Sequence, residues 1–116
     1  MRRPSSDQAI KILKELPVEK AFYYYSEIGS PTGVCARSLG QFLDSMKEIE
    51  TSSLEFHMSR GDFEKWVLML GDETLSQQIT KLGQGDLHGE PLRRRLLQLL
   101  RLRYGLLRKL ALIPTS

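Results

Sequence analysis

The residues of this chain that could do chemistry gather between positions 53 and 70, in the stretch SLEFHMSRGDFEKWVLML. This stretch contains the only tryptophan, Trp66, and one of the two histidines, His57. Arg60 and Asp62 lie between them, so these four residues form the candidate site that the sequence offers. A histidine that meets a carboxylate in a cleft, with a shifted pKa, is a common part of catalytic sites.

An enzyme built from this stretch would use His57 with the carboxylates of Asp62 and Glu64. The competing interpretation is structural. Asp is a strong helix N-cap, so Asp62 would cap the helix after Gly61, and His57 would make an ordinary hydrogen bond in the core. No catalytic motif of defined spacing is present, so we expect the structural roles and no catalytic residue.

Metal and nucleophile chemistry have weaker support. His57 and His88 lie far apart and Cys35 is the only cysteine, so no pair of ligands has the spacing of a metal site. A Cys35 nucleophile would need a lowered thiol pKa, which no local sequence feature indicates. We therefore expect no metal and no cofactor.

Charge is distributed unevenly along the chain, whose net charge is +3. Residues 1–90 contain ten Lys and Arg against fourteen Asp and Glu, whereas residues 91–116 contain seven Lys and Arg and no acid. This asymmetry indicates that the end of the chain meets an anionic partner.

The basic segment is predicted to form a long amphipathic helix over residues 91–113. Arg94, Arg101 and Arg108 recur every seven residues and so lie along one line of this helix. Guanidinium groups in a row neutralise phosphates without reading bases. The leading hypothesis is a non-catalytic binding module for RNA or a ribonucleoprotein such as the ribosome. Its candidate contacts are Arg93, Arg94, Arg95, Arg101, Arg108 and Lys109.

A broad leucine face on the same helix leaves other interpretations open. Leu96, Leu100 and Leu107 could bind a protein partner or a second copy of the chain. The arginines could instead form a solvated face or pair with the acidic body of the chain. A helix lying in a lipid headgroup layer is disfavoured, because the segment has a single tyrosine and no tryptophan or phenylalanine.

The first elements that must position these residues are a helix and a hairpin. Ser5 and Gln8 have the spacing of a capping box for a helix over residues 6–16, which Pro17 would end. Residues 20–37 predict a small β-hairpin, with its turn in the segment GSPTG at 29–33. Three consecutive tyrosines on its first strand could stack on bases, but we expect two buried rings and one at the rim.

Short helices are expected over the rest of the chain. Ser38 is placed to cap a helix, with Gln41 at its capping-box position and an apolar stripe that continues to Ile49. If residues 53–70 form one helix, Phe56 shares a face with Phe63, Val67 and Leu70. The pair Gly61-Asp62 can instead divide the stretch into two helices, and Gly71-Asp72 repeats this pattern before a helix over residues 72–82.

These features predict a mainly α, compact, single domain over residues 1–116. Its core spans about residues 5–82 and includes the small hairpin, and a glycine-rich connector over 83–89 leads to the basic helix. No apolar run is long enough for a transmembrane segment, and no signal peptide is visible. The lone Cys35 suits a reducing compartment, so we expect a cytoplasmic protein.

Three segments, AFYYYSEIGSPTGVCARSLGQF, SLEFHMSRGDFEKWV and LGDETL, resemble an uncharacterised, largely archaeal family of small domains of unknown function. The most specific part is FHxxRGDFEKW, from Phe56 to Trp66, and the resemblance covers about residues 15–82. It implies a compact prokaryotic cytoplasmic domain and transfers no activity. The basic helix lies outside the part that resembles the family.

Overall fold

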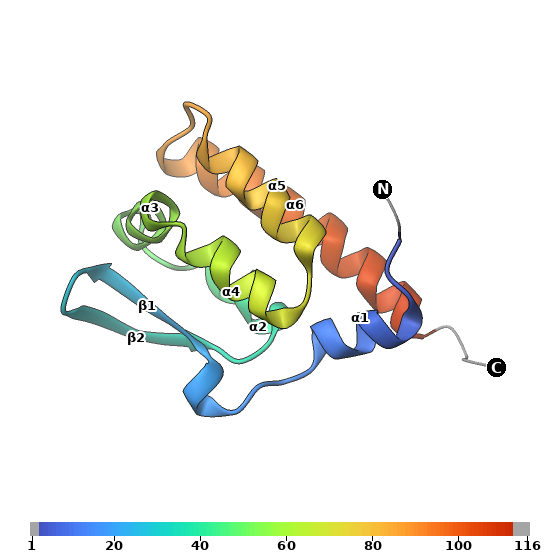
Figure 1. Cartoon of the computed structure of the whole chain (residues 1–116). Coiled ribbons are helices and arrows are strands. Elements are labelled where there is room, and N and C mark those ends of the chain that lie inside the picture. The colour runs from blue at the N-terminus through green and yellow to red at the C-terminus, as the bar shows by residue number, and fades with distance from the viewer. Residues whose placement is uncertain (1–2, 113–116) are drawn as a thin grey trace.

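The computed structural model describes residues 3–112, which form six α-helices and one antiparallel hairpin that lies at one side of them (Figure 1). The elements in chain order are α1 (Ser6–Leu13), the short 3-10 helix η1 (Val18–Lys20), β1 (Phe22–Glu27), β2 (Ser30–Ala36), α2 (Leu39–Met46), α3 (Thr51–Arg60), α4 (Asp62–Leu70), α5 (Glu73–Gly83) and α6 (Gly89–Ala111). The predicted fold class, mainly α with a small hairpin and a long C-terminal helix, is confirmed.

Side-chain caps start α1 and α2 where the sequence predicts them. Ser5 Oγ accepts the Gln8 N–H at 3.1 Å, and Gln8 Oε1 accepts the Ser5 N–H at 2.8 Å, which completes the capping box. Ser38 Oγ likewise accepts the Gln41 N–H at 3.2 Å. A capping box would also have the Gln41 side chain accept the Ser38 N–H. Gln41 Oε1 instead accepts the N–H of the preceding residue, Arg37, so this part of the prediction is wrong.

Helix α1 ends three residues earlier than the predicted boundary at residue 16. Its C-cap, Lys14, already has an extended backbone, and Pro17 disfavours helix at the residue before it. The chain then binds the segment after β2: the Leu16 N–H donates to Arg37 O at 2.7 Å, and Arg37 Nε donates to Leu16 O at 2.9 Å. These two hydrogen bonds join the segments that precede and follow the hairpin.

The hairpin turns earlier than its composition suggests. Glu27 pairs with Ser30, so Ile28 and Gly29 form the turn, and Gly29 adopts a left-handed conformation with φ of 80°. The segment at 30–33, expected in the turn, belongs to β2. Pairing is irregular along the strands, with two shifts of register between Tyr23 and Glu27.

Only one of the three consecutive tyrosines is fully buried, so the expectation of two buried rings is wrong. Phe22 and Tyr24 point into the core, because alternate residues of a strand face the same side. Tyr23 is exposed and Tyr25 is half-buried. Phe22 thus supplies the second inward ring.

The central stretch forms two helices, and Gly61 separates them with φ of 72°. A left-handed residue is the usual end of a helix, and glycine adopts it without a steric penalty. The break removes Phe56 from the face that carries Phe63: Phe63 is completely buried, whereas Phe56 is only half-buried. The single-helix face is therefore wrong, and the alternative of two short helices is confirmed.

The core centres on rings from the hairpin, α2 and α4. The ring of Phe22 lies 5.3 Å from that of Phe63 and 5.9 Å from that of Trp66, and the rings of Phe42 and Trp66 are 5.1 Å apart. The Trp66 indole N–H donates to Lys20 O at 2.9 Å, which ties η1 to α4. The expected burial of Trp66 in the central stretch is confirmed.

Helix α6 contacts α1, α2, α3 and α5. It begins at Gly89, whose N–H donates to Glu55 Oε1 at 2.9 Å, so Pro91 is its third residue and not its first. Leu96, Leu100 and Leu107 are at most 1% exposed and belong to the chain's own core. The leucine face of α6 is therefore covered by the rest of the domain.

Candidate functional sites

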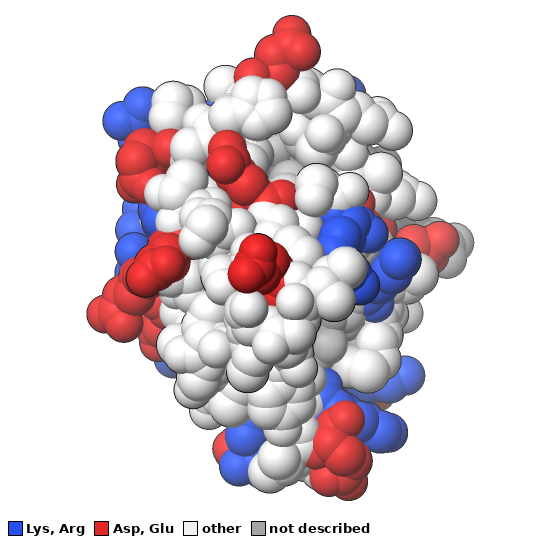
Figure 2. All heavy atoms as spheres, turned by 90° about the vertical axis from the view of Figure 1, so that its left-hand side faces the viewer, with Lys and Arg blue, Asp and Glu red and all other residues white. Residues whose placement is uncertain are grey.

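A groove with a volume of about 500 Å³ separates β1 and the hairpin turn from α3 and α4. We call it the aromatic groove. Its walls include Tyr23, Tyr25, Ile28, Phe56, Trp66 and Met69. On the hairpin side of the molecule, Figure 2 shows uncharged residues over most of the lower middle, with acids on the left, at the top and near the centre, and a basic cluster to the right.

All four candidate residues, His57, Arg60, Asp62 and Trp66, line this groove. His57 and Arg60 are three residues apart on α3, and Asp62 and Trp66 are four apart on α4, so each pair lies on one helix face. The left-handed turn between the helices directs Asp62 back toward α3. The sequence singled out these four residues, and the tertiary structure brings them together.

His57 is only 3% exposed, and both of its ring nitrogens are occupied. Nε2 accepts the backbone N–H of Tyr25 at 2.8 Å, so Nδ1 carries the proton and donates to Asp62 Oδ2 at 2.8 Å. Burial lowers the pKa of His57, and this effect exceeds the opposing effect of the Asp62 hydrogen bond. The ring is a neutral bridge between β1 and α4, with no free nitrogen to act as a base.

Asp62 does not cap α4 with its side chain, contrary to the prediction. It is the first residue of the helix, and its carboxylate binds His57 and also Arg60, whose Nε lies 3.2 Å from Oδ2. The Arg60 guanidinium also lies 5.0 Å from the ring centre of Phe56. The Asp62 carboxylate binds His57 instead of capping α4, because the buried N–H of the His57 ring needs a hydrogen-bond acceptor.

The other residues considered for catalysis lie elsewhere. Glu64 is half-buried and does not line the aromatic groove, and Cys35 is exposed on β2. Within residues 3–112 no three His, Cys, Asp or Glu side chains come close enough to hold a metal ion. The groove itself has aromatic walls and charged side chains at its edge.

The second site is the outward side of α6, which we call the basic face. It consists of five exposed residues, namely Arg94, Arg95, Arg101, Arg108 and Lys109. None of them forms an ion pair with a carboxylate of residues 3–112. Arg95 donates to Gln98 at 2.9 Å, and the Arg108 guanidinium lies 5.8 Å from the ring centre of Tyr104.

Arg93, one of the predicted nucleic-acid contacts, lies inside the domain. It is 9% exposed and donates to Met46 O at 2.9 Å, while its Nε lies 3.0 Å from both carboxylate oxygens of Glu90. The hydrogen bonds from Arg93 lower the pKa of the Glu90 carboxyl. Arg93 therefore joins α6 to the end of α2 and is not available to a partner.

Arg103 has a structural role that sequence reasoning missed. Its Nε and Nη2 donate to both carboxylate oxygens of Asp72, at 2.7 and 2.8 Å, and Asp72 also accepts the Leu75 N–H as the N-cap of α5. The sequence does contain a signal for this role. Arg103 lies three residues after Leu100 and four before Leu107, which places it on the leucine face. A cation at such a position has to find an internal partner.

Comparison with known protein families identifies a matching family. Residues 6–101 match the family described as "Family of unknown function (DUF5752)". The chain belongs to this family. The match includes the whole hairpin and helices α1 to α5, and it extends beyond the expected range of 15–82 into the first half of α6. The entire aromatic groove lies within it, whereas Arg108 and Lys109 lie beyond it.

No curated protein and no solved structure matches the chain.

Across the described part of the chain, none of the helices combines the length and the apolar character that crossing a membrane requires.

Proposed function

We propose that this protein is a non-catalytic binding module that engages an anionic polymer, RNA or a ribonucleoprotein such as the ribosome, through the basic face of α6. The observation that carries the proposal is the difference between the cations on the two sides of α6. Its two inward arginines, Arg93 and Arg103, have internal carboxylate partners, whereas the five outward cations have none among residues 3–112. Unpaired cations at a surface are available to phosphates.

The geometry of the basic face suits a polymer better than a single small anion. Arg94, Arg101 and Arg108 are exposed and spaced by seven residues, so they follow one line about 21 Å long at 1.5 Å per residue. A shallow depression between Arg94, Arg101 and Leu102 adjoins this line. A row of guanidinium groups can contact successive phosphates of one strand, and such contacts depend little on base sequence.

The proposal includes a cytoplasmic setting, in which RNA and ribosomes are the abundant polyanions. The exposed lone Cys35 fits a reducing compartment. The alternative of a protein partner or a second copy bound by Leu96, Leu100 and Leu107 has less support, because these side chains are packed within the domain. An acid–base enzyme built on His57, Asp62 and Glu64 also has less support, because both nitrogens of His57 are engaged and Glu64 lies outside the groove.

The test compares two triple variants that remove the same charge. In the first, Arg94, Arg101 and Arg108 become Gln; in the matched control, the exposed Lys11, Lys14 and Lys20 become Gln. Binding of a labelled single-stranded RNA is measured from about 50 to 200 mM salt, a range over which phosphate contacts weaken strongly. A labelled RNA duplex is measured in parallel.

The arginine variant should bind RNA more weakly, and its slope of log K against log salt should fall by about two to three units, at roughly 0.7–0.9 per phosphate contact. The lysine control should keep most of the parent's affinity and slope. Equal RNA binding by the parent and the arginine variant at every salt concentration would contradict the proposal. So would equal losses in the two triple variants, since these would reflect net charge alone.

A further inference from the structure

The aromatic groove combines apolar walls with a cationic edge. Phe56 and Trp66 supply ring surface from the helices, and Met69 is about half exposed beside them. The charged residues that line the groove are Arg60, Lys65 and Asp62, so its own lining has one net positive charge. The Asp62 carboxylate binds both His57 and Arg60. Lys65 has no carboxylate partner among residues 3–112.

We propose that the aromatic groove binds a small organic anion with a flat apolar body, such as an aromatic carboxylate. The ring of the ligand lies against Trp66, Phe56 and Met69, and its carboxylate faces Lys65. This inference goes beyond the polyanion-binding function proposed for α6, because every residue that lines the groove belongs to the segment from Ala21 to Met69.

The size of the groove fits this class of ligand. Small-molecule sites are clefts of about 300–1,000 Å³ with mostly apolar walls and few polar groups, and the groove has a volume of about 500 Å³. Charge complementarity selects an anion over a cation or a neutral molecule. The only carboxylate in the lining, Asp62, already accepts from His57 and Arg60, whereas the Lys65 ammonium is exposed and unpaired within residues 3–112.

Hydrogen bonds hold the walls of the groove in place before a ligand arrives. His57 joins Tyr25 on β1 to Asp62 on α4, and the Trp66 indole N–H is bound to Lys20 O. The Arg60 guanidinium is held between Asp62 and the ring of Phe56. A site whose walls are already ordered loses little conformational entropy on binding.

The experiment uses the full chain and a matched pair of probes, 3-phenylpropionate and its neutral analogue 3-phenylpropan-1-ol. Trp66 is the only tryptophan, so its indole N–H gives a single signal in a ¹⁵N–¹H NMR spectrum that reports on the groove. Each probe is titrated into the parent and into four single variants, two in the groove and two controls.

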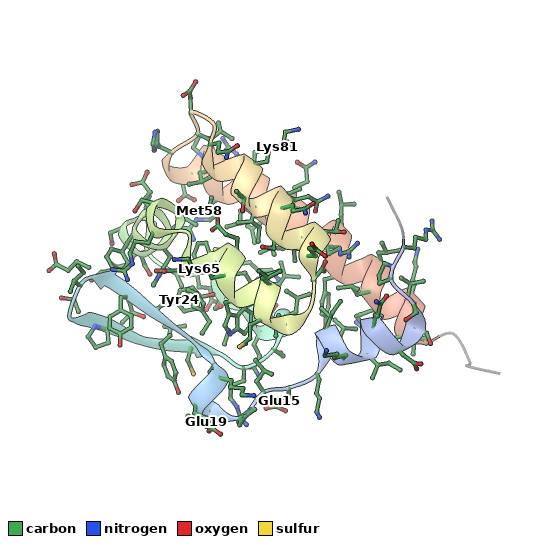
Figure 3. The ribbon with its side chains drawn as sticks, in the orientation of Figure 1. Glu15, Glu19, Tyr24, Met58, Lys65 and Lys81 are labelled. Atoms are coloured by element: carbon green, nitrogen blue, oxygen red, sulfur yellow. The ribbon has the colours of Figure 1, made fainter. Side chains whose placement is uncertain are left out.

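The controls match the groove variants in chemistry and exposure. Met69→Asp introduces a charge in the groove wall, and Leu68→Asp introduces the same charge at a similarly exposed neighbour outside the lining. Lys65→Gln removes the cation of the groove, and Lys81→Gln removes an exposed cation of α5, which Figure 3 shows well away from Lys65 and the hairpin.

The acid should shift the indole signal saturably and bind about fivefold tighter than the alcohol, the size expected of a partly solvated ion pair. Lys65→Gln should remove this preference, and Met69→Asp should weaken both probes about tenfold or more, because it places a charge against an apolar ring. Leu68→Asp and Lys81→Gln should leave both affinities unchanged.

Three results would overturn the inference. Absence of a saturable shift up to millimolar acid would show that the groove is not a site for this class of ligand. Equal binding of acid and alcohol would show an unselective apolar surface. Unaltered acid binding in Met69→Asp would place the probe elsewhere on the protein. Since none of these variants touches α6, RNA binding by the basic face stands or falls separately.

Discussion

At the scale of single residues, His57 shows how a side chain typical of catalysis serves a structural role. Its two nitrogens connect a strand N–H to a helix carboxylate, and protonation of Nε2 would replace an acceptor with a second donor facing Tyr25 N–H. The lowered pKa of His57 follows from its burial, and it keeps the ring in the form that the hairpin requires.

This arrangement predicts a loss of stability in mild acid. Because the folded-state pKa of His57 lies below its unfolded value of about 6.5, the unfolded chain binds the extra proton more readily. The contribution of His57 is therefore fully present above about pH 6.5, and it is lost as pH falls toward the folded pKa. Urea unfolding midpoints between about pH 8 and pH 5 would measure this loss.

The control is His57→Gln, which removes the titrating ring. This variant should be less stable than the parent at neutral pH, because it loses the bridge, but its stability should change less over the same pH window. A parent midpoint that stays constant down to about pH 5, or equal slopes for parent and variant, would show that His57 is not the titrating group.

At the scale of elements, α6 has two kinds of arginine that composition alone does not distinguish. Arg93 and Arg103 lie on the leucine face and bind partners within the domain, whereas Arg94, Arg101 and Arg108 lie on the opposite side and are exposed. The helical repeat explains this division, because the exposed arginines and the buried leucines occupy different positions around the helix axis. The arginines on the leucine face therefore hold the fold together, whereas the exposed arginines are the ones available for the proposed binding.

Arg103→Gln should consequently destabilise the fold by about 3–5 kcal/mol, because it leaves the Asp72 carboxylate, which is 1% exposed, without its cation. Arg101→Gln, two residues away on the exposed side, should change the free energy of unfolding by less than about 0.5 kcal/mol. Urea denaturation of both variants at one pH is the measurement. Similar losses in the two would mean that the Asp72 pair contributes little.

At the scale of the whole molecule, the hairpin and the helices share one core. Rings from β1, α2 and α4 meet at Phe22, Phe42 and Phe63, and α6 closes the other side of the domain with its leucines. In Figure 1 the hairpin lies on one side, α5 and α6 overlap on the other, and α4 lies between them in this view. The two candidate sites thus share a scaffold and have no lining residue in common.

Phe63→Ala tests whether this core is common to the whole domain. Removing a completely buried phenylalanine should cost about 3–5 kcal/mol, and the loss should appear in one cooperative urea transition for hairpin and helices. Phe56→Ala should cost less, because Phe56 is half-buried at the groove. Unchanged unfolding midpoints in Phe63→Ala would place the centre of the core elsewhere.

The sequence alone determined the features whose causes are local. Ser5, Ser38 and Asp72 start helices because their side chains accept a backbone N–H three residues ahead. Gly61 ends α3 because it can adopt the left-handed conformation. Helical and strand periodicity located the helices and the hairpin, and the seven-residue spacing identified the exposed line of α6.

Contacts between distant segments were decided only by the tertiary structure. Asp62 was expected to cap its own helix, but the approach of His57 gave its carboxylate a buried donor to satisfy. Spacing assigned Phe56 to the core, but the break at Gly61 turned it to the groove. The partners of Arg93 and Arg103 lie 47 and 31 residues away along the chain, at Met46 and Asp72. Local periodicity can place a residue on a helix face, but only the packed chain determines which distant group that face meets.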